Sequence, residues 1–216
     1  MPLTLNHDDQ LAYKDEATSF TASVTVSNAD FTLDKASAGS TAIYARQNGS
    51  NRFALNVESD GWSMYSNNGT TWSQGMFMSN GGIVRKPFVP AFSCGAPNGD
   101  SAGVWIANAV FYNNGSHYNN SNGRFTAPVS GHYFFYHWAM GEASGAGTLD
   151  VYSRINGNRD QVGTAYNGAG GSYPHVSAQY IRYMNAGDYV DVYMGQGNYY
   201  NGGDGRHGGW GGHFVG

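Results

Sequence analysis

Histidines and carboxylates are the side chains in this sequence that have the chemistry to hold a metal or to move a proton. Seven histidines are present, and His207 and His213 stand six positions apart, a wider spacing than the tight pairs of most zinc sites. His132 and His137 are separated by an odd number of positions and therefore point to opposite faces of one strand. The sequence predicts no metal site within one chain, and it leaves open an ion on a threefold axis.

The carboxylates favour structural roles over catalysis. A glycosidase needs two carboxyl groups at a defined separation, whereas most acidic residues after residue 86 stand beside Gly or Asn in predicted turns. Asp188, which follows Asn-Ala-Gly, is expected to accept hydrogen bonds from turn amides. The sequence has no G-x-x-x-x-G-K loop of the kind that cradles a phosphate. We therefore predict a protein that is not an enzyme and that carries no cofactor.

The composition predicts an all-β chain with many turns. Only 12% of the 216 residues are charged, 32 are glycine and 15% are aromatic, including 16 tyrosines. Solvated helix faces require more Lys, Glu and Arg, and glycine inside a helix costs about 1 kcal/mol. Aromatic residues suit half-buried strands, and Gly and Asn suit the turns between them.

Charge and hydropathy exclude several classes of partner. The net charge is −4 and there are three lysines, so no basic stripe is available for nucleic acid. The longest apolar stretch, Tyr133 to Met140, is far shorter than the ~20 residues of a membrane span. Cys94 is the single cysteine, and the N-terminus is too acidic for a signal peptide. We expect neither membrane insertion nor classical secretion.

Residues 1–86 and 87–216 are predicted to be separate parts, because glycine is sparse before Gly39 and dense from Gly141 onward, and Arg85 and Lys86 are followed at once by Pro87. After Pro87 the strands become longer and the turn signals regular. The first part is predicted to contain short strands at Ser23–Val26 and Phe31–Leu33. A hairpin around Asn48-Gly49 is predicted to join 42–45 to 53–57. A second hairpin joins 61–65 to 71–73, with Trp62 and Trp72 as cross-strand partners. Isolated hairpins are marginal in water, so other chains should stabilise this segment. Residues 1–18 show no period and are either a tail or a piece that grips a larger assembly.

The second part is predicted to contain regularly spaced strands, a pattern typical of a β-sandwich. The expected strands are 88–93, 104–112, 132–140, 148–155, 161–165, 176–184, 189–195 and 210–215. Several are apolar on both faces: Tyr133 and Phe135 alternate with Phe134 and Tyr136. One face can pack inside the sandwich, and the other would be a large exposed patch unless another subunit covers it.

The segment from Asn113 to Phe135 resembles the signature of the complement C1q and tumour necrosis factor-like globular domain. The matching residues, at the spacing of that family, are Asn113, Tyr118, Phe125, Pro128, Gly131, Tyr133 and Phe135. Downstream, Ile155-Asn-Gly157, Met184-Asn-Ala-Gly-Asp-Tyr-Val190 and Trp210–Val215 resemble further family motifs, and the similarity spans about 87–216. Ala107 and His137 depart from the pattern, which has aromatic residues there.

This resemblance implies a jelly-roll β-sandwich that forms a homotrimer, with aromatic outer faces meeting along a threefold axis. The residues expected at the trimer interface, or on the strand face opposite it, are Tyr133, Phe135, Tyr189 and Tyr193. Residues 1–86 lack the Gly-x-y repeat of a collagen stalk. Their short β stretches with N-G and S-N turns instead resemble the intertwined β segments of bacteriophage tail fibres, by general texture.

The function these features favour is a structural virion protein: a homotrimeric phage fibre or appendage attached to other virion proteins through residues 1–86. A capsid decoration protein and a secreted C1q-like recognition protein stay open as alternatives.

The connections 141–147, 166–175 and 196–209 should gather at one end of the sandwich, because successive antiparallel strands alternate in direction. The jelly-roll resemblance implies that the tethered N-terminus lies at the other end. Flexible loops on a rigid scaffold commonly carry binding. The candidates for contact with a host surface glycan or protein are Tyr166, Tyr173, Tyr199, Tyr200, Asp204, Arg206 and His207.

Overall fold

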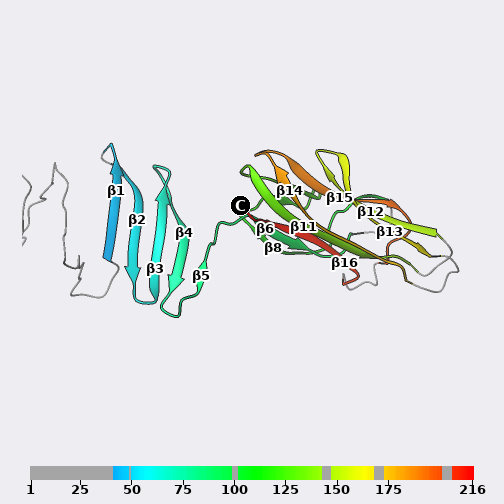
Figure 1. Ribbon diagram of the computed structural model, residues 1–216, viewed down its shortest axis with the longest axis horizontal. Coiled ribbons are helices and arrows are strands. Elements are labelled where there is room, and N and C mark those ends of the chain that lie inside the picture. The colour runs from blue at the N-terminus through cyan, green and yellow to red at the C-terminus, as the bar shows by residue number, and fades with distance from the viewer. Residues whose placement is uncertain (1–40, 49, 99–101, 143–146, 168–172, 201–205) are drawn as a thin grey trace, which may run out of the picture.

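In the computed structural model of the chain, residues 41–48, 50–98, 102–142, 147–167, 173–200 and 206–216 are described. Each regular element within these ranges is a β-strand, which confirms the all-β prediction (Figure 1). The expected strands at Ser23–Val26 and Phe31–Leu33 and the segment 1–18 lie outside the described residues. No helix in the part of the chain that the structure describes is long and apolar enough to cross a bilayer.

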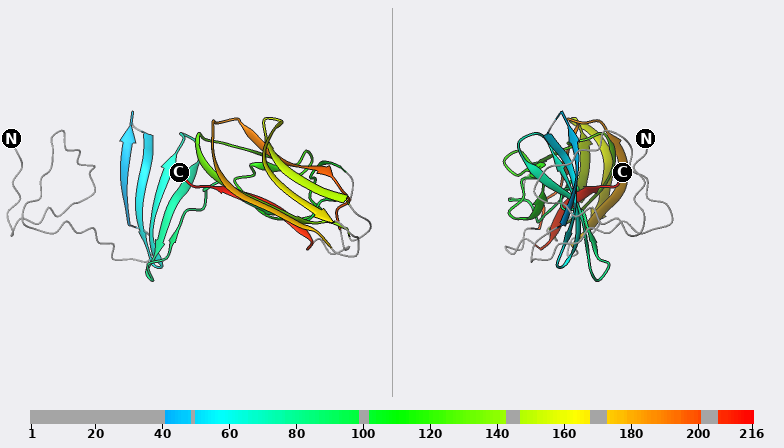
Figure 2. Two further views of the ribbon diagram at one scale, coloured as in Figure 1. Left: turned by 45° about the vertical axis from the view of Figure 1, so that its right-hand side comes forward. Right: turned by 90° about the vertical axis from the view of Figure 1, so that its left-hand side faces the viewer.

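The first five strands form one open antiparallel sheet in chain order, the N-terminal sheet (Figures 1 and 2). Its strands are β1 (Thr41–Gln47), β2 (Ser50–Glu58), β3 (Gly61–Asn67), β4 (Trp72–Ser79) and β5 (Val84–Arg85). The expected hairpin around Asn48 is confirmed, because Ile43 pairs with Leu55 and Asn48 adopts a φ of 50°. Gly61 begins β3 where a Cβ atom would collide with the backbone carbonyl oxygen of Met78.

The pairing expected between Trp62 and Trp72 is wrong. Trp72 lies opposite Asn67 beside the β3–β4 turn, and Trp62 lies opposite Met78. The turn therefore sets a register that separates the two indoles along the strands. Trp72 instead meets the ring of Tyr44, with the ring centroids 6.1 Å apart.

The remaining strands form two sheets that pack as a jelly-roll sandwich (Figure 1). The β11 sheet has the order β14-β11-β16-β6-β8, and the β12 sheet has the order β13-β12-β15-β10-β9 with β7 also paired to β15. The β11 sheet contains β6 (Ala91–Cys94), β8 (Val110–Asn114), β11 (Gly131–Met140), β14 (His175–Met184) and β16 (Gly208–Phe214). The β12 sheet contains β7 (Gly103–Val104), β9 (Tyr118–Asn119), β10 (Arg124–Thr126), β12 (Gly147–Ile155), β13 (Asn158–Asn167) and β15 (Tyr189–Gln196).

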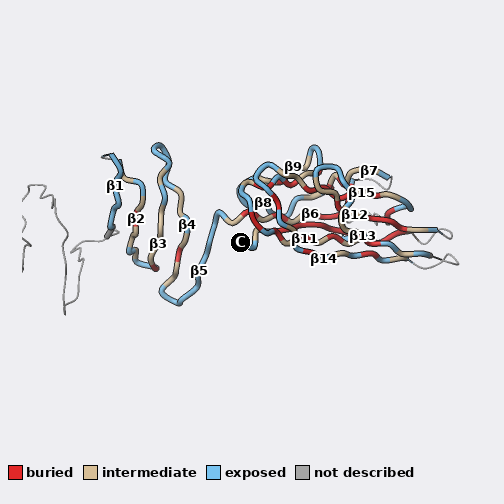
Figure 3. The backbone as a smooth tube through the Cα atoms, turned by 45° about the horizontal axis from the view of Figure 1, so that its top comes forward, coloured by how far each residue is buried: buried red, intermediate tan, exposed pale blue. Residues whose placement is uncertain are grey.

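An aromatic core lies between these two sheets. Phe92 stacks on Tyr118 and Phe125 at centroid distances of 4.8 and 5.0 Å and meets Trp210 edge-on at 4.6 Å. Offset and edge-on arrangements are the favourable ones for aromatic rings. Figure 3 shows buried backbone concentrated in the sandwich, while the N-terminal sheet is mostly intermediate or exposed.

The single strand expected over 104–112 is wrong. The chain leaves β7 after Val104, and Trp105 turns fully into the core with its indole N–H donating to the carbonyl oxygen of Gly95. The amide side chain of Asn120 then bonds both the N–H and the C=O of Ala107. The backbone N–H groups of Trp105 and Asn108 donate to the carbonyl oxygens of Val192 and Ala96, both at 2.8 Å. These mixed partners satisfy the segment without a regular strand ladder until β8 begins.

Candidate functional site

The two faces of β11 differ in what covers them. Tyr133, Phe135 and His137 point into the core and are at most 1% exposed, whereas Phe134 and Tyr136 point outward and are half-buried. The expectation that Tyr133 and Phe135 reach a subunit interface is therefore corrected, because both side chains are buried in the core of their own chain. The alternative, that their facing partners form the outer surface, is the arrangement that the structure has.

The outer face of the β11 sheet is aromatic and aliphatic, and we call it the aromatic face. Phe134 on β11 lies opposite Ile181 on β14 and His213 on β16, and Tyr136 lies in the next outward row opposite Gln179 and Gly211. None of the side chains in these two rows carries a carboxylate or a guanidinium. Its large apolar members that are more than a third exposed are Phe111, Tyr112, Ile181 and Tyr183.

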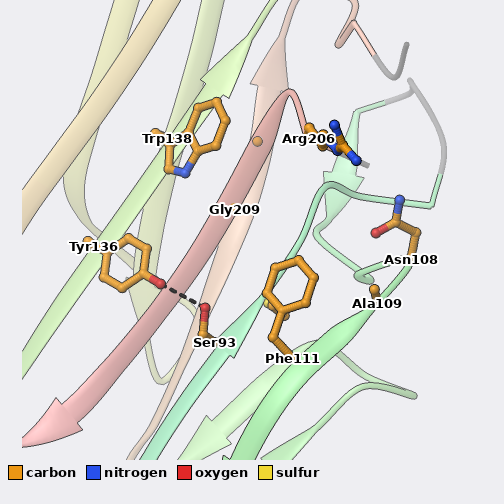
Figure 4. A pocket seen from close by; sticks show the side chains of 10 residues that line it. Ser93, Asn108, Ala109, Phe111, Tyr136, Trp138, Arg206 and Gly209 are labelled. Atoms are coloured by element: carbon orange, nitrogen blue, oxygen red, sulfur yellow. Dashed lines mark hydrogen bonds between the residues drawn. The ribbon is translucent and has the colours of Figure 1, made fainter. Parts of the chain in front are cut away.

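A hollow of 520 Å³ opens in the aromatic face between β8 and the β11–β16 pair (Figure 4). Tyr136 and Trp138 line one side of it, and Phe111 lines the other. The hydroxyl groups of Ser93 and Tyr136 are hydrogen-bonded at 2.9 Å. Glycine in β16 makes room for these rings, since a Cβ on Gly211 would lie 2.8 Å from the Tyr136 hydroxyl oxygen.

Tyr189 and Tyr193, also expected at a trimer interface, lie on the other sheet. The guanidinium of Arg124 sits 4.1 Å from the Tyr189 ring centroid, and that of Arg154 sits 4.4 Å from the Tyr193 ring centroid. Arginine held over an aromatic ring is a favourable cation–π contact. The four predicted interface residues therefore do not share one surface, which corrects that prediction.

Ion pairs cover the outer face of the β12 sheet. Asp191 is fully buried, and Arg154 donates to both of its carboxylate oxygens at 2.7 and 3.0 Å, which raises the pKa of Arg154. Arg159 similarly holds both oxygens of Asp150 at 2.8 Å. Both carboxylates therefore form structural ion pairs. The outer face of the β12 sheet is covered by these ion pairs, whereas the outer face of the β11 sheet is aromatic.

The described flanks of the three long connections meet at one end of the sandwich, which we call the loop end. The backbone N–H of Gly141 donates to Pro174 at 2.8 Å, that of Glu142 donates to Asn198 at 3.0 Å, and Tyr199 bridges to Gly141. These bonds join the described flanks of 141–147, 166–175 and 196–209.

The opposite end carries the turns and the entry of the chain. Asn156 bonds the carboxylate of Asp188 at 2.8 Å, and Asp188 accepts the backbone N–H of Asn185 at 2.8 Å. These bonds lower the pKa of Asp188, which confirms its predicted role in the turn. Phe214 N–H donates to the carbonyl oxygen of Pro90, so the chain enters the sandwich beside its own C-terminal strand (Figure 2).

Three of the candidate recognition residues form an aromatic cluster at the loop end. The ring of Tyr200 lies 4.8 Å from that of Tyr173 and 4.8 Å from that of His207, edge-on to both. Tyr173 is 49% exposed, and Tyr166, on β13, is 72% exposed. Arg206 is also exposed. We call Tyr173, Tyr200 and His207 the loop-end cluster.

Tyr199 does not belong to this surface. It is fully buried, and its ring lies 5.5 Å from that of Trp105 in the core. Its placement as a recognition residue is corrected, because consecutive strand-like residues face opposite ways and Tyr200 takes the outer position. Asp204 lies outside the described residues.

Two titratable groups sit deep in the sandwich. Burial lowers the pKa of His137 to about 4 and raises the pKa of the Cys94 thiol to about 12. A neutral buried thiol is unreactive. Within the described residues, no three His, Cys, Asp or Glu side chains gather as metal ligands.

The fold and these surfaces define an all-β jelly-roll domain in which ion pairs cover the outer face of one sheet and the outer face of the other is aromatic. Comparison with protein families matches residues 88–215 to the C1q domain, and the chain belongs to this family.

Two solved structures are similar to the chain. The globular domain of zebrafish complement 1qA protein is 21% identical with a TM-score of 0.45, covering 59% of this chain and 97% of that one. Murine APRIL is 10% identical with a TM-score of 0.47, covering 59% and 99%. No curated protein matches the sequence.

Proposed function

We propose that the protein is a non-enzymatic homotrimer in which the C1q-like sandwich is an outward head and the N-terminal sheet is a stalk, and that this trimer is a fibre or appendage of a bacteriophage particle. The observation that carries the proposal is the aromatic face. A soluble monomer rarely leaves such a patch open, and covering it favours association by about 25 cal/mol per Å² of apolar area before the costs of binding.

The contrast between the sheets identifies the face that should be covered. The β12 sheet satisfies its outer side chains within the chain, as Arg154 and Asp191 show. The β11 sheet leaves Ile181 52% exposed and Tyr183 57% exposed, although the Tyr183 ring meets the ring of His132 at a centroid distance of 5.4 Å. Around a threefold axis, three copies of this face would exclude water from one another.

Light scattering tests the trimer. We expect the wild-type protein to have the mass of three chains at micromolar concentration, and the double variant Ile181→Asp and Tyr183→Asp to be a folded monomer. Val162→Asp is the matched control, since Val162 is 43% exposed on β13 of the other sheet. A wild-type monomer, or a double variant that stays trimeric, would count against assembly through the aromatic face.

The virion setting rests on the N-terminal part. The N-terminal sheet joins the head through the short segment between β5 and β6, and residues 1–86 lack the Gly-x-y repeat of a collagen stalk. Immunogold labelling of purified phage particles with antibodies against the head tests this setting. Label on a tail or fibre supports the proposal, label over the whole capsid supports a decoration protein, and protein found only in culture medium supports a secreted recognition protein.

The last part of the proposal is that the loop end binds the surface of the host. Tyrosine combines a large apolar ring with a polar hydroxyl, which suits glycan and protein surfaces alike. We expect Tyr173→Ala with Tyr200→Ala to reduce adsorption of particles to host cells about tenfold or more while the mass of the trimer stays constant. Val129→Ala, 47% exposed in the connection before β11 at the opposite end, is the control. Unchanged adsorption by the double variant would remove recognition from this cluster.

A further inference from the structure

The N-terminal sheet is a single layer whose two faces differ sharply. On one face, Ile43, Leu55, Met64 and Met76 form a row across β1 to β4. The next row on the same face is Val57, Trp62, Met78 and Val84. We call these eight residues the apolar face. Not one of them carries a charge or a hydrogen-bonding group other than the indole N–H of Trp62.

The opposite face mixes polar groups with aromatic rings. The side-chain amide of Gln74 donates to the hydroxyl oxygens of Ser63 and Tyr65 at 2.8 and 3.2 Å, and the Tyr65 hydroxyl donates to Glu58 at 3.3 Å. Arg85 lies over the ring of the buried Phe77 at 4.4 Å. The two faces therefore differ in charge and hydrogen bonding, and the apolar face has the composition of a core.

Nothing in the described part of the chain covers the apolar face. Val57 is 58% exposed, Val84 is 51% exposed and Ile43 is 45% exposed. A hollow of 400 Å³, lined in part by Leu55, Val57 and Trp62, is open on this side. A sheet of this kind requires a second apolar layer for stability.

We propose that the apolar faces of three copies close on one another as a three-walled β-prism, with the row of Ile43, Leu55, Met64 and Met76 running along its axis. This inference rests on the proposed homotrimer and extends it from the head to the N-terminal sheet. The head places three copies around one axis, and the short connection from β5 to β6 keeps each N-terminal sheet close to its own head.

The orientation of the sheet fits this geometry. The strands β1 to β5 are stacked along the longest axis of the chain, with β5 nearest the head (Figures 1 and 2). A threefold axis that passes through both the head and the N-terminal sheet therefore crosses the strands, so the two apolar rows run along the axis and the strand ends lie at the corners of the prism. Strands of about 7 to 9 residues make walls about 23 to 30 Å wide.

Cross-linking in the full-length chain tests the prism. Met64→Cys places a thiol at the expected axis, and Leu55→Cys provides a second position one strand away. Tyr44→Cys is the matched control, because Tyr44 lies on the opposite face and is 49% exposed. The native Cys94 is buried, so it does not compete for the oxidant or for maleimide.

We expect Met64→Cys to form disulfide-linked pairs of chains at a rate independent of protein concentration, to resist maleimide, and to remain trimeric by light scattering. Tyr44→Cys should react with maleimide and form no such pairs. A trimer in which both positions react equally with maleimide would overturn the prism and leave the proposed function standing. A trimer in which Met64→Cys is protected but forms no pairs would also overturn it, because residues 1–40 of the same chain would then be the cover. A monomeric wild-type protein would contradict both the prism and the proposed homotrimer.

Discussion

At the scale of single residues, His137 is the group whose environment departs furthest from water. It is 1% exposed in the middle of β11, where the C1q pattern has an aromatic residue, and burial lowers its pKa to about 4. An unfolded chain gives histidine a pKa near 6.5. Below that pH the unfolded state takes up a proton that the folded state refuses.

Replacing His137 by Phe should therefore flatten the dependence of stability on pH. The wild-type protein should lose stability as pH falls from about 6.5 to about 4, by about 3 kcal/mol in total for this group. Denaturant unfolding of both proteins at a series of pH values measures the difference. Parallel curves would show that His137 does not titrate in this way.

Asp191 gives a second prediction at this scale. Asp191→Ala leaves Arg154 without its bidentate partner, and Arg124 also loses a carboxylate oxygen at 3.6 Å. Because the Asp191 side chain is fully buried, we expect a loss of about 3 kcal/mol in the free energy of unfolding.

Asp160→Ala is the matched control, since Asp160 pairs with Arg182 at 3.1 Å in a more exposed setting. Such partly solvated pairs contribute about 1 kcal/mol or less. Equal losses in urea unfolding for the two variants would show that burial does not distinguish them.

At the scale of elements, β16 shows why this chain uses so much glycine. Its outward glycines, Gly211 and Gly209, lie beside Tyr136 and Trp138. A Cβ atom added to the inward Gly212 would lie against the ring of Phe135 and 2.6 Å from the carbonyl oxygen of Phe134. The large rings of β11 thus occupy the space that side chains on β16 would take. Glycine here is a packing requirement of two neighbouring strands.

Gly212→Ala should accordingly destabilise the sandwich by about 2 kcal/mol, because the added methyl meets backbone atoms that cannot move aside. Gly147→Ala, at the start of β12, adds a methyl with nothing within 4 Å and should change stability little. Thermal unfolding followed by near-ultraviolet circular dichroism compares the two. A Gly212→Ala protein as stable as Gly147→Ala would mean that β11 and β16 can separate slightly at no cost.

At the scale of the whole molecule, each part of the chain leaves one apolar surface open: the aromatic face on the head and the apolar face on the N-terminal sheet. In the proposed trimer both are covered by the same threefold arrangement. Stability should then depend on association as well as on the fold of each chain.

The midpoint of thermal unfolding should consequently rise with protein concentration, by several degrees over a hundredfold range, because dilution favours separated chains. Calorimetry at concentrations from one to one hundred micromolar measures this, and the Ile181→Asp and Tyr183→Asp variant should show a midpoint that is lower and independent of concentration. A wild-type midpoint that does not move with concentration would argue that each chain is stable alone.

Much of the fold was predictable because its signals are local. The alternation in Tyr133 to Met140 marks a strand, the turn at Asn156-Gly157 marks a hairpin, and the Asn-Ala-Gly-Asp segment marks the turn that Asp188 closes. These features depend on neighbours within a few positions, where residue type restricts the backbone directly. The C1q signature then adds long-range order to the local elements.

The sequence by itself determined the all-β class, the head with its family, and the grouping of the long loops at one end, since strand direction alternates along the chain. Only the tertiary structure decided which aromatic residues are inside. Tyr133, Phe135 and Tyr199 belong to the core, while Tyr189 and Tyr193 lie beneath arginines on the other sheet. Both faces of these strands carry aromatic residues, so local pattern cannot tell which face meets the opposing sheet. That choice depends on pairing between segments far apart in the chain.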